Sequence, residues 1–461
     1  MIKCLKPIVV IAGILLLAGC VTIPPEGKPQ TTGVGQLAIN TPVDRTGEEP
    51  GIDENSTLDD YLHRAFAHNP GLRMAFERQQ AALERIPQSQ ALDDPALTFE
   101  YFLEQKDTRY QVGLTQSFPA FGTLRLRAKK AAAEADAAGY AAEAERLTLF
   151  DRVIKAFHEY HYLSRATQVT EEAYRLLSDL EQVMDTRYRT GLAPFSDLIK
   201  AQVEKDRIAS DLESLRDERS SQSAGLAALL NLPVYDELPW PRVMPSGSAI
   251  MDTETLDDML GELNPELKAA GAMIDAETVR EQLARRNFLP GIMLGANWMA
   301  MPGADGQGDE TDVSVMAGIT LPLWRGKYSA EIREAEAMRR AATGERDNMQ
   351  NRLKAELSMA IVKFRTAERR MVLFRDSLIP KAEQALEVAQ QDFSSGKVDF
   401  MTLIDGRRTW LEFRLMLERA TADREIAMGE IGCCIGVYSI ASTPGETGRN
   451  PLHNDQEGAQ P

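Results

Sequence analysis

Cysteine and histidine are scarce in this chain. Four of its 461 residues are cysteine and five are histidine, and no Cys-x-x-Cys pair occurs. Cys433 and Cys434 are adjacent, a spacing at which a disulfide between them would strain the intervening peptide. The sequence therefore predicts a fold that is held together by packing and not by a disulfide framework, and it assigns this adjacent pair no role.

Motifs for enzyme chemistry are also missing: there is no phosphate-binding Gly loop, nucleophile elbow or zincin motif. His158 and His161 could share a metal at helical spacing, but no third ligand is nearby, and the alternative is a half-exposed structural pair. Met293, Met299 and Met301 offer thioethers for soft Cu(I), and the alternative is that they fill a barrel lumen or face lipid. The sequence predicts no enzyme and no cofactor.

Positive charge is in the minority, with a formal net charge of −17. This balance argues against a nucleic-acid partner, because such proteins need basic patches that displace counterions. The apolar run Ile8 to Leu17 is too short to cross a bilayer as a helix. Because Lys3 and Lys6 precede it and small residues follow, it reads as a secretory signal, residues 1–19.

The signal ends in Leu17-Ala18-Gly19-Cys20, which resembles a bacterial lipobox. The resemblance implies cleavage before Cys20 and diacylglycerol on its sulfur, which anchors a chain to lipid. Val21 in place of Asp implies the outer membrane. The alternative is an ordinary signal peptide with an incidental cysteine. Residues 20–55, rich in Pro, Gly and Thr, predict an extended tether, and residues 441–461 predict a disordered tail.

The rest of the chain contains an internal duplication. Thr57-Leu58-Asp59-Asp60 followed by Asn69-Pro70 has its counterpart in Thr255-Leu256-Asp257-Asp258 followed by Asn264-Pro265. Further matches follow in the same order. The sequence predicts two structural repeats, residues 56–250 and 251–440, that form one composite unit.

Most of each repeat has a helical pattern. A short amphipathic helix precedes each Asn-Pro pair, which offers an N-cap and a proline at the first helical position. Long helices are expected over 123–189 and from 328 to a break at Pro380, and sixty-odd helical residues span about 100 Å. Turns at Gly191 and Gly396 then reverse the chain. Each repeat therefore predicts one long helical hairpin, at about 123–232 and 328–438.

Four short segments alternate between apolar and polar or small residues, as strands do. They are residues 96–104, 109–118, 291–300 and 311–321, and each repeat pairs its two as a β-hairpin. Strands of about ten residues fit a membrane β-sheet, and the alternative is a soluble sheet with one face on a core. In lipid an open sheet edge is not tolerated, so several copies of the chain must pool their strands.

Together these features resemble the TolC-type outer-membrane efflux family over residues 56 to about 438. The resemblance rests on the repeated Asn-Pro opening, Ser117-Phe118-Pro119-x-Phe121-Gly122 and the Arg187-Tyr188-Arg189-Thr190-Gly191 turn. It implies an α+β membrane protein in which three copies share a twelve-stranded β-barrel and a periplasmic α-barrel. It further implies a periplasmic adaptor and an inner-membrane pump, of resistance-nodulation-division type, as partners.

In the family the hairpin tips close the tube and dock on the adaptor. The resemblance places the docking tips at Gly191 and Gly396. It places the periplasmic aperture at Asp405, Thr402, Asp399 and Asp197. Asp405 stands where the family carries an axial acid, whereas Thr402 replaces its other frequent acid and Asp399 could substitute. The alternative for Asp405 is an acid on a solvated helix start, favoured there by the helix dipole.

The function implied by the resemblance is an outer-membrane duct, a passive exit for substrate that a pump delivers. Two rivals stay open at the level of sequence: a lipid-anchored periplasmic adaptor and a lipoprotein hydrolase. The adaptor has one hairpin inserted in other domains, and the hydrolase needs a catalytic set that is missing here. The sequence does not name the cargo, which could be a metal cation, a drug or another amphiphile.

Overall fold

The structure is a computed structural model that describes residues 51–103, 108–241, 252–302 and 309–438. The described residues belong to one compact unit, and both repeats lie within it. The predicted signal, most of the tether and the tail lie outside the described residues.

Each repeat opens with short helices, where the sequence predicted them. In the first repeat they are α2 (Leu58–His68), α3 (Pro70–Leu83) and α4 (Arg85–Gln90); in the second they are α7 (Thr253–Leu263) and α8 (Pro265–Arg286). Asn69 caps α3 by accepting from the N–H groups of Gly71 and Leu72, and Asn264 caps α8 by accepting from that of Leu267. The expected Asn-Pro helix starts are confirmed.

The same two asparagines have a second contact that the sequence did not reveal. The side-chain amide of Asn69 donates to the carbonyl of Leu229 at 3.1 Å, and that of Asn264 donates to the carbonyl of Cys434 at 2.9 Å. Both carbonyls lie in the last turn of a helix, where backbone acceptors have no partner within the helix. Each Asn-Pro pair therefore fastens the start of its repeat to the end of the same repeat.

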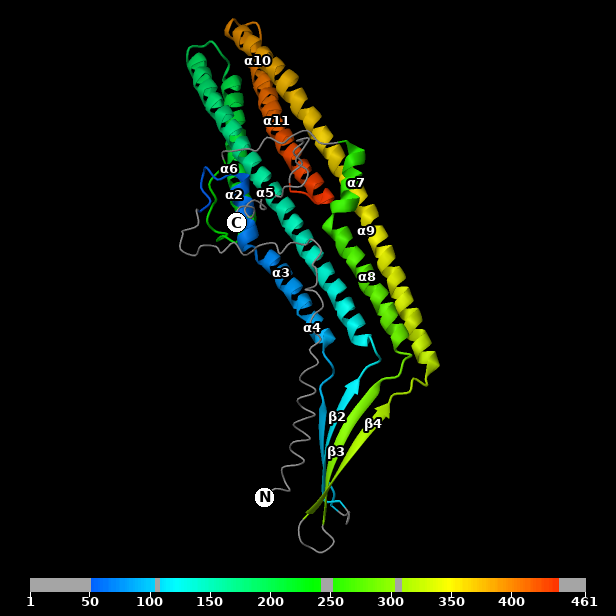
Figure 1. Cartoon of the computed structure of the whole chain (residues 1–461). Coiled ribbons are helices and arrows are strands. Elements are labelled where there is room, and N and C mark those ends of the chain that lie inside the picture. The colour runs from blue at the N-terminus through cyan, green and yellow to red at the C-terminus, as the bar shows by residue number, and fades with distance from the viewer. Residues whose placement is uncertain (1–50, 104–107, 242–251, 303–308, 439–461) are drawn as a thin grey trace, which may run out of the picture. The chain divides into compact units, whose positions relative to one another are not determined.

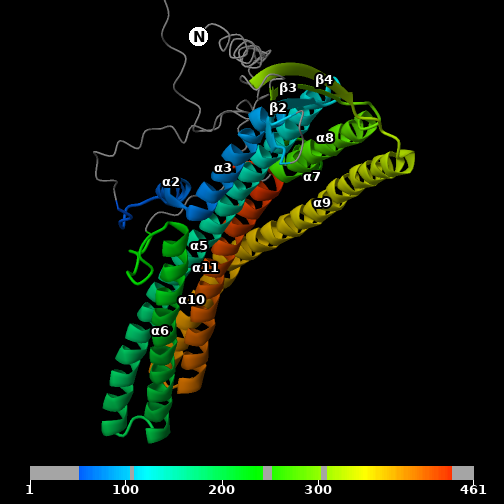
Figure 2. The same cartoon turned by 90° about the horizontal axis from the view of Figure 1, so that it is seen from below.

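Two long helical hairpins follow the short helices. The first consists of α5 (Thr123–Arg189) and α6 (Phe195–Leu229). The second consists of α9 (Arg325–Leu373), the π-helical turn η1 (Phe374–Leu378), α10 (Ile379–Ser394) and α11 (Phe400–Ile435). Figure 1 shows that both hairpins extend away from the strands. Figure 2 shows α6 beside α5 and α11 beside α10.

The expected break at Pro380 is wrong, because the chain passes it without interruption. A proline inside a helix lacks an N–H group and its ring meets the carbonyl four residues earlier. Here η1 ends two residues before Pro380, and the N–H of Ile379 donates to the carbonyl of Phe374, five residues back. One π-helical turn thus absorbs the misfit and lets α9 continue into α10.

Both hairpin tips have one backbone geometry. Gly191 and Gly396 adopt φ of 72° and 75°, which favours glycine. The N–H of Leu192 donates to the carbonyl of Arg187 at 2.7 Å, and that of Lys397 donates to the carbonyl of Asp392 at 2.8 Å. The N–H groups of Gly191 and Gly396 also donate to the carbonyls three residues earlier, those of Tyr188 and Phe393. Together these bonds make a Schellman motif at each of the glycine turns that the sequence predicted.

The four strands form one antiparallel sheet in the order β1-β2-β3-β4. Their bounds are β1 (Ala96–Tyr101), β2 (Tyr110–Phe118), β3 (Ile292–Pro302) and β4 (Asp309–Ile319). Each repeat pairs its own two strands, as predicted. In addition β2 pairs with β3, so that the sheet joins the two repeats through one continuous hydrogen-bond ladder.

Three buried apolar clusters hold the helices together. One joins α2, α3, α5 and α6 around Tyr61, Phe157 and Tyr160. Another joins α7, α8, α9 and α11 around Leu260 and Phe364. The remaining cluster lies toward the tips, where residues of α5, α6 and α11 pack together. This last cluster binds one hairpin to the other.

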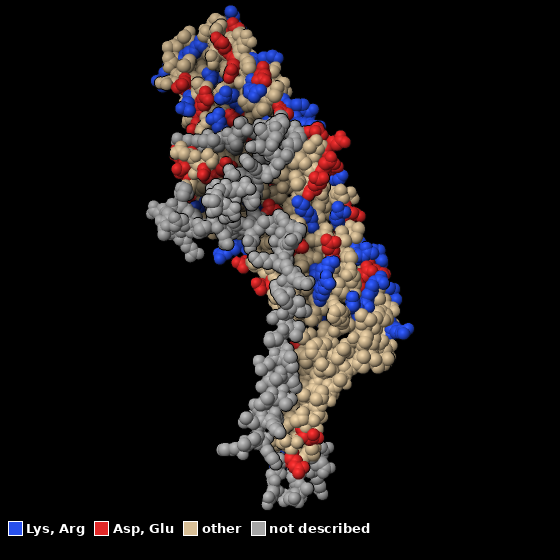
Figure 3. All heavy atoms as spheres, viewed as in Figure 1, with Lys and Arg blue, Asp and Glu red and all other residues tan. Residues whose placement is uncertain are grey.

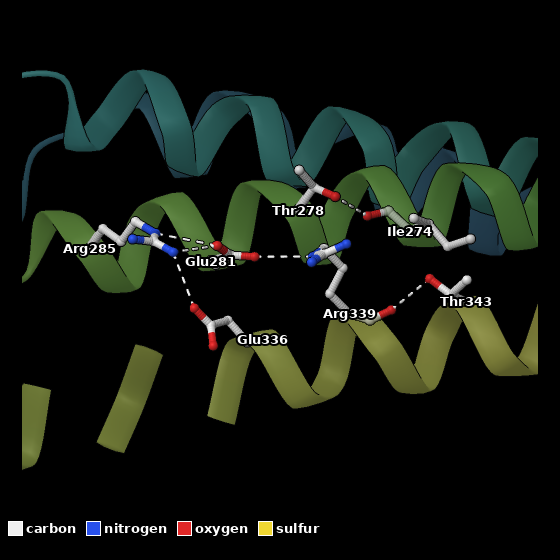
Figure 4. A network of polar contacts seen from close by, with 7 residues as sticks. All are labelled: Ile274, Thr278, Glu281, Arg285, Glu336, Arg339 and Thr343. Atoms are coloured by element: carbon white, nitrogen blue, oxygen red, sulfur yellow. Dashed lines mark hydrogen bonds and ion pairs between the residues drawn. The ribbon is translucent and has the colours of Figure 1, made fainter. Parts of the chain in front are cut away.

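Helix α8 packs along α5 and along α9. Figure 4 shows the ion pairs that join α8 to α9: Arg285 of α8 contacts Glu336 of α9 at 3.1 Å, and Arg339 of α9 contacts Glu281 of α8 at 3.1 Å. Within α8, Arg285 also contacts Glu281 at 2.8 Å, which connects the two pairs. Such pairs stabilise little one by one, but a connected set also fixes how the two helices align.

Candidate functional site: a two-faced sheet and the hairpin tips

The strand register sorts the sheet side chains into two faces. Directly paired residues share a face, and successive residues alternate between faces. One row across the four strands reads Thr98, Gly113, Asn297 and Ser314, and the next reads Glu100, Gln111, Met299 and Asp312. We call this side the polar face. The pattern predicted from sequence therefore holds across all four strands, including the junction between the repeats.

The opposite side, which we call the apolar face, carries large hydrophobic residues. Its rows include Leu97, Leu114, Ala296 and Val315, then Phe99, Val112, Trp298 and Val313. Much of this face is exposed, including Leu97, Phe99, Val315 and Ile319. No described helix covers it in the way that a soluble sheet would require, and a contiguous exposed apolar surface marks an interaction site.

Aromatic residues lie toward both ends of the apolar face. Away from the helices, Tyr110 contacts Trp298 with ring centroids 5.5 Å apart and Phe99 at 6.3 Å. At the strand-to-helix junctions, Phe121 is 96% exposed and Trp324 is 76% exposed. Aromatic belts on both sides of an apolar band are typical of membrane β-sheets.

Two sheet edges are open in a single copy of the chain. Within the described residues β1 pairs only with β2, and β4 only with β3. Their outer edges leave unpaired N–H and C=O groups, which invite pairing with another strand. The polar face also has a hollow where strands meet helices, lined by Ser117, Met293 and Gly318 with Arg127 and Glu331.

The acids predicted from sequence lie near the tips, at the starts of α6 and α11. Asp399 is the N-cap of α11 and accepts from the N–H of Thr402 at 2.9 Å and from its hydroxyl at 2.7 Å. These hydrogen bonds lower the pKa of Asp399. Asp197 lies in the first turn of α6 and pairs with Lys200 at 3.2 Å. The Asp405 side chain is 62% exposed, against 18% for Asp197, so it is the more available acid of the two.

An ion pair between the two hairpins was missed by sequence reasoning. The Glu204 side chain on α6 is 3% exposed and accepts from Arg408 on α11 at 2.5 Å and from Arg207 at 2.6 Å. Arg408 also contacts Asp405 at 3.6 Å. Burial raises the pKa of Glu204, but the hydrogen bonds from Arg408 and Arg207 outweigh it and lower that pKa overall. A helical Glu among many charged residues gives no sequence signal of this partner.

The histidine pair is buried, which corrects the expectation of a half-exposed pair. His158 is 2% exposed, its Nδ1 has no hydrogen-bond partner, and His161 is also buried. Burial, together with the neighbouring His161, lowers the pKa of His158 to about 4. Among the described residues no group of three His, Cys, Asp or Glu side chains could hold a metal ion. Packing between helices explains the burial, because α5 contacts partners on several sides.

The methionines lie on the polar face. Met293, Met299 and Met301 alternate with residues of the apolar face along β3. The thioether methyl of Met293 lies over Gly318, where an added Cβ would be 3.2 Å from it. The sequence left open whether these methionines fill a barrel lumen or face lipid, and the structure places them on the side opposite the apolar face.

Cys20 lies outside the described residues. Cys433 and Cys434 are free thiols in the last turn of α11. Burial raises the pKa of each to about 12, so neither is a reactive thiolate at neutral pH. Within the described ranges, none of the helices combines the length and apolar character needed to cross a bilayer.

These features define a class of protein, in which a duplicated chain contributes two helical hairpins and one sheet to a larger assembly. The sheet has a polar face, an apolar face and two unpaired edges. A profile of outer membrane efflux proteins matches residues 61–232 and 257–432, one match in each repeat. The chain belongs to the outer membrane efflux protein family, and the resemblance seen in the sequence is confirmed. This assignment favours the duct over the adaptor and hydrolase readings.

Solved channels share the fold. VceC of Vibrio cholerae superposes with a TM-score of 0.71 at 18% identity, covering 82% of this chain and 96% of that one. The CmeC outer membrane channel of Campylobacter jejuni gives 0.72 at 14% identity, covering 86% and 90%. At such identities the likeness shows the fold alone.

Curated relatives match over shorter spans. An uncharacterized Haemophilus influenzae protein is 24% identical over 200 residues, 42% of this chain and 44% of that protein. The pyoverdine export outer membrane protein OpmQ of Pseudomonas putida is 22% identical over 328 residues, 66% of each chain. The aligned parts thus span under half of the first relative and about two thirds of the second.

Proposed function

We propose that this protein is the outer-membrane exit duct of a tripartite efflux system, built from three copies whose twelve strands form one β-barrel. The observation that carries the proposal is the two-faced sheet with both edges unpaired. Lipid requires an outward apolar face and no bare edge. A ring of copies meets both conditions, with the polar face and its hollow turned to the passage.

The duplication indicates how neighbouring copies meet. Strand pairing between β2 and β3 joins the first repeat to the second, so its repeat equivalent joins β4 of one copy to β1 of the next. Helix α9 is the repeat equivalent of α5, and α3 is that of α8. The contact between α5 and α8 within one copy therefore predicts a contact between α9 of one copy and α3 of the next. Exposed apolar residues on these helices support it: Met74 on α3, and Met338, Met359 and Val362 on α9.

The remaining partners rest on family likeness. We propose that the Gly191 and Gly396 tips dock on a periplasmic adaptor, which serves an inner-membrane pump of the resistance-nodulation-division type. Acyl chains on Cys20 would anchor each copy to the outer membrane. OpmQ is named for pyoverdine export, and a siderophore is accordingly one cargo to test beside metal cations and drugs.

A cross-linking experiment tests the proposed ring. Ser117 of β2 pairs with Met293 of β3, and their repeat equivalents are Thr320, directly after β4, and Thr98 of β1. We expect the variant Thr98→Cys/Thr320→Cys to form disulfide-linked trimers in outer membranes, seen on a non-reducing gel. The same protein under reducing conditions should run as a single chain.

A matched control comes from the neighbouring position of β4. Ile319, the last residue of β4, lies on the apolar face, whereas Thr98 and, by alternation, Thr320 lie on the polar face. The variant Thr98→Cys/Ile319→Cys should therefore stay uncross-linked, as should each single-cysteine variant. Equal cross-linking of both double variants, or of neither, would contradict the proposed strand pairing.

We propose that Asp405, rather than the mutually bonded Asp399 and Thr402, forms the acidic ring of the aperture, with Asp197 nearby on α6. Three exposed carboxylates around a narrow axis would repel one another and favour cations. We expect Asp405→Ala to raise single-channel conductance in planar bilayers and to weaken cation selectivity. Asp376, an exposed acid paired with its neighbour Arg375, serves as the control; unchanged conductance in Asp405→Ala would remove this residue from the aperture.

A further inference from the structure

Two helix starts, at equivalent points of the two repeats, carry several cations although the chain as a whole is acidic. The net charge is −17, and α2, α6, α7 and α8 each carry an acid in the first turn. The first turns of α5 and α9 carry no acid, as is also the case in α3, α4, α10 and α11. In these two helices Arg125 and Arg325 lie in the first turn, and Lys129 and Arg333 follow four and eight residues later.

This placement is unfavourable within the chain itself. The N-terminus of a helix carries a partial positive charge and stabilises anions, so cations there raise the electrostatic energy. Two helices at equivalent points of the two repeats share the same unfavourable arrangement. An anion from outside the chain would offset it.

Helix geometry shows which way the cations point. Arg127 lines the hollow on the polar face. Arg125 and Lys129 lie two residues before and after it, and at 3.6 residues per turn both project to the opposite side. In the second repeat Lys327 and Glu331 line the same hollow. Arg325 lies two residues before Lys327 and Arg333 two residues after Glu331, so both likewise project away from it. The cations thus face outward, on the side of the apolar face.

These outward cations are available for a partner. Arg125, Lys129, Arg325 and Arg333 are all exposed, and across the described ranges none of them has an ion-pair or hydrogen-bond partner for its side chain. The arginines farther along α8 and α9 differ, because Arg285 and Arg339 pair with carboxylates. Figure 3 shows Lys and Arg gathered where the helices meet the strands, next to a sheet that carries almost no charge until its far end.

An apolar surface adjoins the cations. Phe121, Leu323 and Trp324 are exposed at the two strand-to-helix junctions, directly before α5 and α9. They continue the apolar face of the sheet toward the helices. Going from strands to helices, the outside of the molecule therefore passes from apolar to aromatic to cationic, the order in which a bilayer passes from acyl chains to phosphates.

We propose that Arg125, Lys129, Arg325 and Arg333 form a cationic collar that binds the phosphates of anionic phospholipids in the leaflet facing the helices. The inference rests on the proposed function, which places the apolar face in the membrane. In a ring of three copies the collar repeats around the channel. It holds the strand-to-helix junction at the level of the headgroups.

Lipid binding by the purified, detergent-solubilised full chain tests the collar. Native mass spectrometry would count bound phosphatidylglycerol and phosphatidylcholine at low and high ionic strength. We expect the unmodified protein to retain phosphatidylglycerol preferentially and to lose that preference as salt screens the charges. Changing all four collar residues to Gln should remove the preference, with about a five-fold loss of phosphatidylglycerol affinity per cation.

A matched control neutralises four exposed cations away from the junction: Lys155, Arg175, Arg216 and Arg370. This control should keep the preference, and both variants should keep the trimer on a sizing gel. An unmodified protein without preference, or a collar variant that retains it, would overturn the inference. Failure of the proposed function would look different, because a protein without a membrane-embedded sheet would retain neither lipid.

Discussion

Replacing Arg408 with alanine is expected to open the channel at its tips. Arg408 on α11 donates to the buried Glu204 on α6 and so links the two hairpins of one copy. Removing it leaves the buried Glu204 carboxylate with Arg207 as its one remaining partner. Losing a hydrogen bond between charged groups costs about 1.5–3 kcal/mol. We expect a lower melting temperature and a raised single-channel conductance in planar bilayers.

Two further variants separate this link from a general loss of stability. Glu204→Gln combined with Arg408→Ala removes the uncompensated charge, so stability should recover while conductance stays high. Arg189→Ala breaks an exposed pair with Asp185 near the same tip and should change neither property. A conductance in Arg408→Ala equal to that of the unmodified channel would show that Glu204 and Arg408 only stabilise the helices.

Acid is expected to destabilise the protein through His158. Its pKa is lowered from 6.5 to about 4 by burial and by His161, so the folded protein binds fewer protons than the unfolded chain between these values. Stability is therefore complete above pH 6.5 and falls as the pH drops toward 4. The conversion of 1.36 kcal/mol per pKa unit gives a loss of about 3 kcal/mol per copy.

Thermal unfolding as a function of pH measures this loss. His158→Gln removes the titrating group, so its melting temperature should change less between pH 7 and pH 4.5 than that of the unmodified protein. The matched control is His63→Gln, because His63 is exposed on α2. His161 faces Glu418 of α11 and Arg165, and its own pKa is lowered by burial, so His161→Gln should reduce the acid loss as well. Parallel pH profiles for His158→Gln and the unmodified protein would contradict the assignment.

Local patterns in the sequence determined the elements and their faces. Alternation along the strands predicted the polar and apolar faces because side chains of a strand alternate by geometry alone. The Asn-Pro pairs and Gly191 and Gly396 predicted helix starts and tips because the residues that cap a helix lie within a few positions of its end. Duplication supplied the repeats, and the order of these signals supplied the family.

What the sequence could not decide depends on residues far apart in the chain. Glu204 meets Arg408, β2 meets β3, and His158 becomes buried only when the hairpins and repeats pack against each other. Neither Glu204 nor His158 differs from an exposed helical residue in its local pattern, because burial is set by neighbouring helices. At Pro380 the continuity of the long helix comes from the π-helical turn beside it, and Phe374 of that turn packs against Phe413 of α11 with ring centroids 5.8 Å apart.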